Sequence, residues 1–233
     1  MKAVILAGGK GSRLAPYTTV LPKPLMPIDE MPILEIVLKQ LKFHGFTDIV
    51  IAVGHLAALI KAYFGDGARV GLNIDYAVED APLGTAGPLG TIDGLDETFL
   101  VMNGDILTDL DFSAVVEEHR RREAMITVAA YKRTVKIDFG VLKTEGALLT
   151  DYIEKPTLDY VVSMGIYVME PAVRKHVPAG QYMDLPDLVK LLLSKHERVG
   201  AYMFDGQWLD IGRPDDFLEA QSRFEQHRDQ FLK

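Results

Sequence analysis

Apolar side chains recur at two different periods along the first hundred residues. Residues 1–6 and 48–53 are short and almost continuously apolar, which is typical of strands buried on both faces of a parallel sheet. Residues 32–44 and 56–64 carry apolar side chains at helical spacing, and each run ends beside a glycine. The pattern therefore predicts strands and helices in alternation.

The alternation continues to about residue 105. Residues 72–79 are predicted as a strand, 85–93 as a short helix and 98–105 as the next strand. Such an order predicts a mostly parallel sheet covered on both faces by right-handed crossovers. Because ligands of these sheets bind beyond the carboxyl ends of the strands, the glycine-rich loop after residue 6 and Asp105 are expected at one edge.

The second half of the chain differs. A helix is predicted at 112–122, with Asp111 as its N-terminal cap. Strands then follow without helices between them, at 125–131, 138–143, 147–153 and 161–169. Two helices, 185–195 and 214–230, flank a strand at 199–204. We expect an antiparallel or mixed portion that forms a small lobe closing over the sheet.

The expected fold class is α/β, a Rossmann-like three-layer α/β/α arrangement with a mostly parallel mixed sheet and a small β-rich lobe. The 233 residues contain no repeat, low-complexity tract or linker, so 1–233 is treated as a single domain with two lobes. No apolar run reaches the ~18 residues that a membrane span needs. With no export signal at the start of the chain, a cytoplasmic protein without a membrane partner is expected.

Charge narrows the choice of ligand. The net charge is −8, from 25 basic and 33 acidic residues, which argues against DNA or RNA as a partner. Residues 1–28 nevertheless contain Lys2, Lys10, Arg13 and Lys23 and no acid. This suggests a small anionic ligand, although a randomly basic, solvated stretch is the plain alternative. The absence of cysteine excludes disulfides and thiolate chemistry.

Three glycines crowd the turn after the first predicted strand. Gly8, Gly9 and Gly11 allow a sharp turn and bring backbone amides close to phosphate oxygens. The loop lacks the Gly-Lys-Ser/Thr ending of a Walker loop, and Leu14 stands where the dinucleotide fingerprint needs its third glycine. One interpretation is a phosphate-binding loop of another kind, but the loop taken alone is weak evidence, and a glycine-rich turn without a ligand is the plain alternative.

Arg13 and Lys23 strengthen this interpretation. Arginine offers phosphate a planar fork, and lysine offers a compact point charge. Pro22 and Pro24 restrict the backbone around Lys23, so the lysine loses less entropy when it engages a ligand. A loop lysine that merely has proline neighbours is the plain alternative.

The stretch LAGGKGSRLAPYTTVLPKPLMPI, residues 6–28, resembles the signature of the sugar-nucleotide pyrophosphorylases, which are nucleotidyltransferases that act on sugar 1-phosphates. The resemblance continues through PLGTAG (82–87), NGD (103–105), FGV (139–141), EKP (154–156), GIYV (165–168) and WLDIG (208–212). It implies a glycosyltransferase-A-like fold in which residues 1–110 bind mainly the nucleotide and residues 111–233 contribute mainly to the sugar side and the C-terminal helices.

The resemblance also implies catalytic roles for Arg13, Lys23, Asp105 and Asp210. In that family the two aspartates coordinate Mg²⁺ (or Mn²⁺), a cation that prefers carboxylates, phosphate oxygens and water. Taken alone, each aspartate would be interpreted as a turn cap. The implied nucleotide-binding residues are Leu6, Ala7, Gly8, Gly9, Gly11, Ser12, Glu79, Pro82, Leu83, Gly84, Thr85 and Asn103.

On the sugar side, the implied residues are Gly140, Glu154, Lys155, Ser163 and Gly165. In the family the glutamate binds sugar hydroxyls and the lysine binds the sugar phosphate, whereas a surface ion pair is the plain alternative. Neighbouring strand residues face opposite sides, so both reach one pocket only if the chain bends near Pro156. Many relatives carry Asn-Ala-Gly where this chain has Ser163-Met164-Gly165, which leaves the sugar open.

The stretch EDAPLGTAGPL, residues 79–89, is most similar to the guanylyltransferases that make GDP-mannose and related sugars. As a chemical possibility, Glu79 accepts hydrogen bonds from N1–H and the amino group of guanine. A uridylyl branch shares much of the pattern. The chain leaves no room for the β-helix domain of many GDP-mannose enzymes, which makes a less common sugar, such as a heptose, an option.

The expected function is therefore a magnesium-dependent transfer from GTP to a mannose- or heptose-like sugar 1-phosphate, giving an NDP-sugar and pyrophosphate. The sugar phosphate oxygen attacks the α-phosphorus in line, so alignment and charge stabilisation carry the reaction. Three alternatives stay open: a UTP- or dTTP-dependent enzyme for glucose or N-acetylmuramic acid 1-phosphate, a glycosyltransferase that uses a nucleotide-sugar, and a non-catalytic sensing subunit. A homo-oligomer is neither indicated nor excluded.

Overall fold

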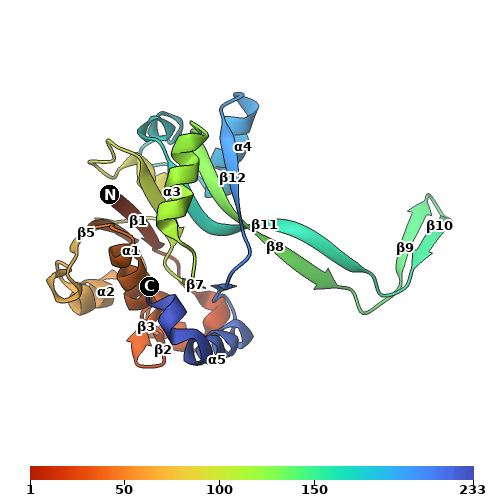
Figure 1. Cartoon of the computed structure of the whole chain (residues 1–233), viewed down its shortest axis with the longest axis horizontal. Coiled ribbons are helices and arrows are strands. Elements are labelled where there is room, and N and C mark those ends of the chain that lie inside the picture. The colour runs from red at the N-terminus through yellow and green to blue at the C-terminus, as the bar shows by residue number, and fades with distance from the viewer.

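The centre of the computed structural model, which describes residues 1–233, is a seven-stranded sheet with helices on both faces (Figure 1). Its strands, in spatial order, are β12 (Val199–Phe204), β8 (Ile126–Lys136), β11 (Thr157–Met169), β6 (Phe99–Asn103), β1 (Lys2–Ala7), β4 (Asp48–Val53) and β5 (Asn73–Val78). Only β11 runs antiparallel to its neighbours, while the other pairs are parallel. The predicted mostly parallel mixed sheet is confirmed.

Alternate strand residues divide between two apolar layers, because successive side chains of a strand face opposite sides. Ile5 packs with the layer of α1 (Ile33–Phe43), α2 (Ala57–Phe64) and α3 (Phe112–Arg121), whereas Val4 packs with α4 (Leu185–Ser194). The predicted helix at 85–93 is only a 3₁₀ turn, η5 (Gly87–Gly90), because glycine destabilises an α-helix. No helix is long and apolar enough to span a membrane.

A third apolar cluster lies under the last helix, α5 (Pro214–Phe231). It includes side chains from β2 (Pro27–Ile28) and β3 (Met31–Pro32), which form a short hairpin, and from β7 (Ile106–Thr108). β7 pairs antiparallel with β13 (Trp208–Asp210). The sequence pattern did not predict these short strands, although they connect the C-terminal segment to the end of β6.

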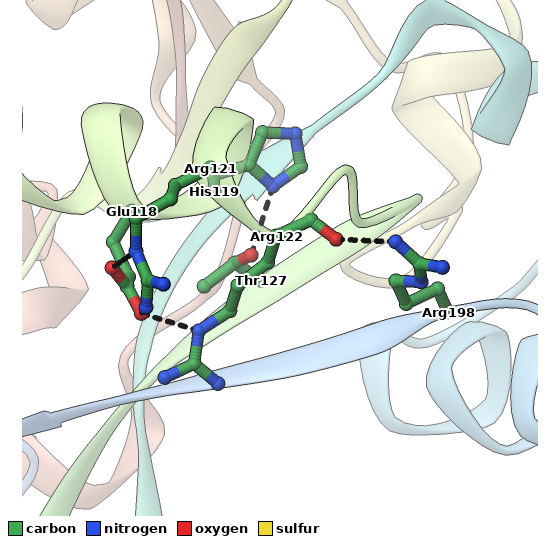
Figure 2. Close-up of polar contacts among 6 residues, drawn as sticks. All are labelled: Glu118, His119, Arg121, Arg122, Thr127 and Arg198. Atoms are coloured by element: carbon green, nitrogen blue, oxygen red, sulfur yellow. Dashed lines mark hydrogen bonds and ion pairs between the residues drawn. The ribbon is translucent and has the colours of Figure 1, made fainter.

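Helix α3 is fixed at both ends. The carboxylate of Asp111 accepts a hydrogen bond from the Ala114 amide at 3.1 Å, which confirms the predicted cap. Near the other end, the buried ring of His119 lies 2.9 Å (Nδ1) from the Thr127 hydroxyl of β8 (Figure 2). Its Nε2 lies 3.1 Å from the Glu170 carboxylate. These contacts tie the helix to the sheet and satisfy both ring nitrogens.

The outer halves of β8 and β11 leave the body as a two-stranded arm (Figure 1). The arm continues into a hairpin of β9 (Val141–Glu145) and β10 (Leu148–Ile153). Nearly all residues from 132 to 162 are exposed. The predicted β-rich portion is present, but it forms an outward arm and does not close over the sheet, because residues 157–163 pair with 130–136 without interruption and carry the hairpin outward.

Candidate active site

The glycine-rich loop and Asp105 meet at the carboxyl edge of the sheet. β1 and β6 are parallel neighbours, so the segments that follow them emerge side by side. A cavity of about 250 Å³ between them, called here the loop cavity, is lined by Leu6, Ala7, Gly9, Gly11, Ser12, Arg13, Lys23, Pro24, Gly104 and Asp105. The structure thus gathers the residues predicted to hold phosphates around one space.

The loop keeps its backbone close to this cavity. Gly11 has a φ of +62°, a left-handed conformation that favours glycine, and a side chain there would lie 2.9 Å from the Thr18 methyl. The Thr18 hydroxyl donates to the Gly11 carbonyl at 2.8 Å, which holds the turn. The chain then forms a 3₁₀ turn, Ser12–Leu14, in which Leu14 is buried and Arg13 stays exposed.

Lys23 is almost fully buried, with 8% of its surface exposed. It begins a 3₁₀ turn, Lys23–Leu25, between the buried Pro22 and Pro24. A buried ammonium group needs a counter-charge, and the Lys23 Nζ forms an ion pair with Oδ2 of Asp105. The other oxygen, Asp105 Oδ1, is buried without a hydrogen-bond partner. One carboxylate oxygen is therefore available for a ligand.

Asp210 comes from the far end of the chain to the same place. In the β7–β13 pair, Asp210 lies opposite Ile106, and the Ile211 amide donates to the Asp105 carbonyl at 3.1 Å. Burial, and after it the charge of Asp105, raises the pKa of Asp210, while Lys23 acts in the opposite direction. The strand pairing and the backbone hydrogen bond therefore place the two aspartates beside each other.

These two carboxylates fit a divalent cation. The unpartnered Asp105 Oδ1 and the neighbouring Asp210 are the hard oxygen donors that Mg²⁺ prefers. No group of three or more His, Asp or Glu side chains is arranged as a metal site. The protein therefore offers an incomplete ligand set, which suits a cation that also binds phosphate oxygens and water.

A second space, the base cavity, opens on the other side of the glycine loop. It measures about 360 Å³ and is lined by Leu6, Gly8, Gly9, Glu79, Pro82, Gly84, Thr85, Asn103, Asp105 and Tyr182. Oε2 of Glu79 accepts from the Leu83 amide at 2.9 Å, and burial raises the pKa of this carboxyl group. The Asp184 carboxylate accepts from the amide of Thr85 at 3.0 Å, which fastens the 82–87 segment to the chain before α4.

A third space, the sugar cavity, measures about 270 Å³ and is lined by Thr85, Asn103, Ser163, Met164, Gly165, Tyr167, Leu185, Pro186, Trp208 and Asp210. The pairing of β11 with β8 is irregular between Ser163 and Tyr167. The Ser163 hydroxyl lies 3.0 Å from the Tyr167 hydroxyl and accepts from the Gly165 amide at 3.2 Å. Gly165 has a φ of +74°, and a side chain there would come within 2.7 Å of the Asn103 amide nitrogen.

Three predicted sugar residues lie elsewhere. Gly140, Glu154 and Lys155 belong to the arm and line none of these three cavities. Glu154 and Lys155 are exposed, and their charged groups are 3.9 Å apart. The chain bends at these two residues, where Lys155 has a φ of +44°. The bend does not bring them to the edge of the sheet.

The sequence reasoning did not include eight of the lining residues, which are Pro24, Gly104, Met164, Tyr167, Tyr182, Leu185, Pro186 and Trp208. Trp208 stands two positions before Asp210 in the same short strand, so strand alternation places both on one face and could have found it. Tyr182 lies one hundred residues beyond Pro82, and nothing in the sequence connects them. The contact arises because the Met183 amide donates to the Leu83 carbonyl at 3.0 Å.

A cationic glycine loop faces two neighbouring carboxylates at the edge of this sheet, and this arrangement suits phosphorylated ligands and a divalent cation. Residues 2–227 match the Nucleotidyl transferase family, so the chain belongs to that family, and the resemblance found in the sequence is confirmed. The fold agrees with the glycosyltransferase-A-like arrangement that the resemblance implied.

Individual relatives differ in their substrates. The chain is 38% identical to a UTP–glucose-1-phosphate uridylyltransferase of Synechocystis sp., over 94% of this chain and 62% of the relative. It is 32% identical to a mannose-1-phosphate guanylyltransferase of Mycobacterium tuberculosis, over 94% of this chain and 63% of the relative. The chain thus spans less than two thirds of the length of these curated relatives.

Solved structures show the same fold over nearly the whole chain. A candidate glucose-1-phosphate thymidylyltransferase from Bacillus anthracis, crystallised with sucrose, superposes with a TM-score of 0.78 at 27% identity, covering 99% of this chain and 98% of that one. HddC from Yersinia pseudotuberculosis superposes with a TM-score of 0.75 at 23% identity, covering 96% and 99%.

Proposed function

We propose that this chain transfers a nucleotidyl group from a nucleoside triphosphate to a sugar 1-phosphate and releases pyrophosphate. One observation carries the proposal: the buried Lys23–Asp105 ion pair lies beside Asp210, where the loop cavity, the base cavity and the sugar cavity adjoin. Asp105 lines the first two cavities and Asp210 lines the third. The two substrates would therefore meet at these charged groups.

The chemistry follows from the charges that must be brought together. A sugar phosphate oxygen forms a bond to the α-phosphorus while the bond from that phosphorus to the β-phosphate oxygen breaks, and the electron pair leaves with pyrophosphate. Lys23 stabilises the charge that develops on the α-phosphate. Arg13 and the amides of the glycine loop hold the leaving phosphates.

Asp105 and Asp210 would hold Mg²⁺ (or Mn²⁺), which neutralises phosphate charge and aligns the two reacting groups when bound. The Lys23 ammonium group keeps one Asp105 oxygen in place, so the second oxygen points to a fixed position. The ion pair with Lys23 therefore also orients the Asp105 oxygen that would bind the metal.

We propose guanine as the base. One oxygen of Glu79 is taken by the Leu83 amide, which leaves the other oxygen for the nucleotide. Guanine presents N1–H and an amino group on one edge, so a carboxylate matches it, whereas uracil and thymine present one N–H between two carbonyl groups. The mannose-1-phosphate guanylyltransferases among the relatives, and HddC solved with GMP-PN, agree with this choice.

The second candidate is a UTP-dependent enzyme for glucose 1-phosphate. The observation that favours it is the 38% identity to the Synechocystis uridylyltransferase, against 32% and 34% for the guanylyltransferases of Mycobacterium tuberculosis and Yarrowia lipolytica. For the sugar we propose a mannose- or heptose-like ring whose hydroxyls meet Ser163. An unchanged KM for the sugar phosphate in Ser163→Ala would contradict that contact.

The test is pyrophosphate release with magnesium, mannose 1-phosphate and each of GTP, UTP, dTTP, CTP and ATP. Release with GTP supports the guanine proposal. Release only with UTP or dTTP keeps the reaction and overturns the role given to Glu79. If all five are silent, the panel is repeated with glucose, heptose and N-acetylated sugar 1-phosphates, and silence there would remove the proposed function.

A further inference from the structure

A fourth cavity, called here the arginine cavity, lies between the root of the arm, β13 and the start of α5. It measures about 350 Å³ and is lined by Arg13, Tyr131, Arg133, Trp208, Leu209, Asp210, Arg213, Asp216, Glu219 and Arg223. Four of these ten lining residues are arginines. Only Arg13 and Asp210 among these residues have a role in the reaction described above.

Three of the four arginines are not engaged in an ion pair within the protein. The Arg223 guanidinium donates to the Glu219 carboxylate and to the Gln207 side chain, so it is already satisfied. Asp216 accepts a hydrogen bond from the Gly212 amide at 3.1 Å. Arg13, Arg133 and Arg213 form no ion pair and make no side-chain hydrogen bond within the chain. The acids that face them are Asp210, Asp216 and Glu219.

The backbone directs these side chains to one place. β12 ends at Phe204, which pairs with Tyr131 of β8, so Arg133 stands two residues beyond the covered part of the strand and on the same face as Tyr131. Lys132 faces the other way and pairs with Asp159 at 2.8 Å. The ring of Tyr131 lies 5.3 Å from that of Trp208, which forms the wall of the cavity.

Arg213 reaches the cavity from a different element. It occupies the N-terminal cap of the 18-residue helix α5, where unpaired backbone amides and the helix dipole add positive potential. The first-turn acids Asp215 and Asp216 reduce this potential in part. Arg133 and Arg213 therefore add two side-chain charges to the partial charge of a helix end.

The position of the arginine cavity indicates its ligand. It shares Arg13 with the loop cavity, where the triphosphate would lie, and Asp210 and Trp208 with the sugar cavity. We propose that Arg133 and Arg213, together with Arg13, form a phosphate subsite that takes the pyrophosphate portion of the nucleotide and the released pyrophosphate. This subsite rests on the proposed function and names two positioning residues for its leaving group.

Pyrophosphate fits better than the sugar phosphate. It carries more negative charge in two linked phosphoryl groups, so it can engage several separate guanidinium groups, each of which suits phosphate oxygens. The sugar 1-phosphate must instead keep its single phosphate next to the α-phosphorus while its ring lies in the sugar cavity. The experiment separates these two sources of phosphate.

The experiment is calorimetric titration of the full chain with pyrophosphate and, separately, with mannose 1-phosphate. The variants are R133Q, R213Q and their combination, with K132Q as the matched control on the opposite face of the same strand. We expect each single variant to bind pyrophosphate about tenfold more weakly, as loss of a hydrogen bond to a charged group does. The double variant should lose about 100-fold, and K132Q should bind like the wild type.

Unchanged pyrophosphate binding in R133Q/R213Q would overturn the subsite, and so would a loss confined to mannose 1-phosphate. The substituted residues are exposed, so the variants should unfold at the wild-type temperature, which is checked first. Titration needs no turnover. If no nucleotide releases pyrophosphate but the arginine variants still bind pyrophosphate more weakly, the proposed reaction is wrong and the subsite stands. If the wild type turns over but R133Q/R213Q binds pyrophosphate normally, the reaction stands and the subsite is wrong.

Discussion

The carboxyl edge of the sheet and the arm both carry residues that the sequence singled out, but only the edge gathers them. At the edge, β1 pairs with β6 and β7 with β13, so positions one hundred residues apart are held by hydrogen-bonded register and by buried side chains on both faces. The outer strands of the arm pair only with each other and have no layer to pack against. A sequence motif therefore predicts the position of a site residue only where burial fixes the strand that carries it.

This difference matters for Glu154 and Lys155. They can act on a sugar at the edge only if the arm bends over its own body or lies over a second copy of the chain. The arm exposes large apolar side chains, such as Phe139 with 77% of its surface in solvent. Either arrangement would cover some of this surface. Evidence that the arm is packed in solution would therefore remove the difference between the arm and the edge of the sheet.

The largest expected effect is the difference in unfolding free energy between two phenylalanine-to-alanine variants. Phe99, in β6, is 1% exposed, and Phe99→Ala should destabilise the fold by about 3–5 kcal/mol because it leaves a cavity in the core. Phe139→Ala should change the unfolding free energy by less than about 0.5 kcal/mol, since its ring touches water. Urea unfolding of the two variants measures both values. A cost above about 1 kcal/mol at Phe139 would show that the arm is packed in solution.

The next comparison uses two ion-paired lysines. Lys23→Ala should lower kcat by about 10²-fold or more, because it removes a buried charge next to the reacting phosphate. Lys143, in the arm, pairs with Asp151 at 2.9 Å, and both side chains are exposed. Lys143→Ala should leave kcat unchanged and serves as the control. Near-normal turnover in Lys23→Ala would take Lys23 out of the mechanism.

The elements that could be predicted are those whose pattern is local. The strands β1, β4 and β6 and the helices α1 and α3 follow from continuous or helical apolar spacing, and the cap at Asp111 follows from its residue type. The meeting of the glycine loop with Asp105 follows from the rule for parallel sheets. These features need no information about distant partners.

Other features depend on contacts that no local pattern contains. The β7–β13 pair brings Asp210 beside Asp105, and only the family motif indicated that meeting. Tyr182 reaches the base cavity through backbone contacts of Leu83 that the sequence does not reveal. The direction of the arm depends on where β8 and β11 leave the sheet, and turn residues predict a hairpin without predicting its orientation.

A smaller effect tests the arm directly. Lys155→Ala should raise the KM for the sugar 1-phosphate about tenfold and leave the KM for the nucleotide unchanged, as loss of one charged contact to a phosphate would. Steady-state kinetics with each substrate varied in turn measure both constants, and Lys143→Ala is again the control. An unchanged KM for the sugar phosphate would leave Lys155 as a surface residue of the arm.

Mixing variants would then show which copy supplies the arm. Lys155→Ala chains keep an intact edge, and Lys23→Ala chains keep an intact arm. If a second copy supplies Lys155, a mixture of the two variants regains a low KM for the sugar phosphate in part of its sites. If the arm bends over its own body, the mixture has only the sum of the two separate activities.

The smallest effect is in the pH dependence of stability, and it again contrasts body with arm. Burial lowers the pKa of His119 despite the neighbouring Glu170, so the folded ring stays neutral where the unfolded ring, near pH 6.5, takes up a proton. Stability from this group is present above that pH and is lost as the pH falls. In the arm, the hydrogen bond from Lys132 lowers the pKa of the exposed Asp159, whose contribution disappears only below the ordinary aspartate range.

Acidification from pH 7.5 to 5.5 should therefore lower the unfolding temperature because of buried histidines such as His119, and it should leave the ion pairs of the arm intact. In His119→Gln the fall in unfolding temperature between these two pH values should be smaller than in the wild type. The comparison between pH values is the readout, because loss of the contacts to Thr127 and Glu170 lowers stability at both. Burial also lowers the pKa of His44, so part of the fall should persist, and an equal fall in both proteins would contradict the role of His119.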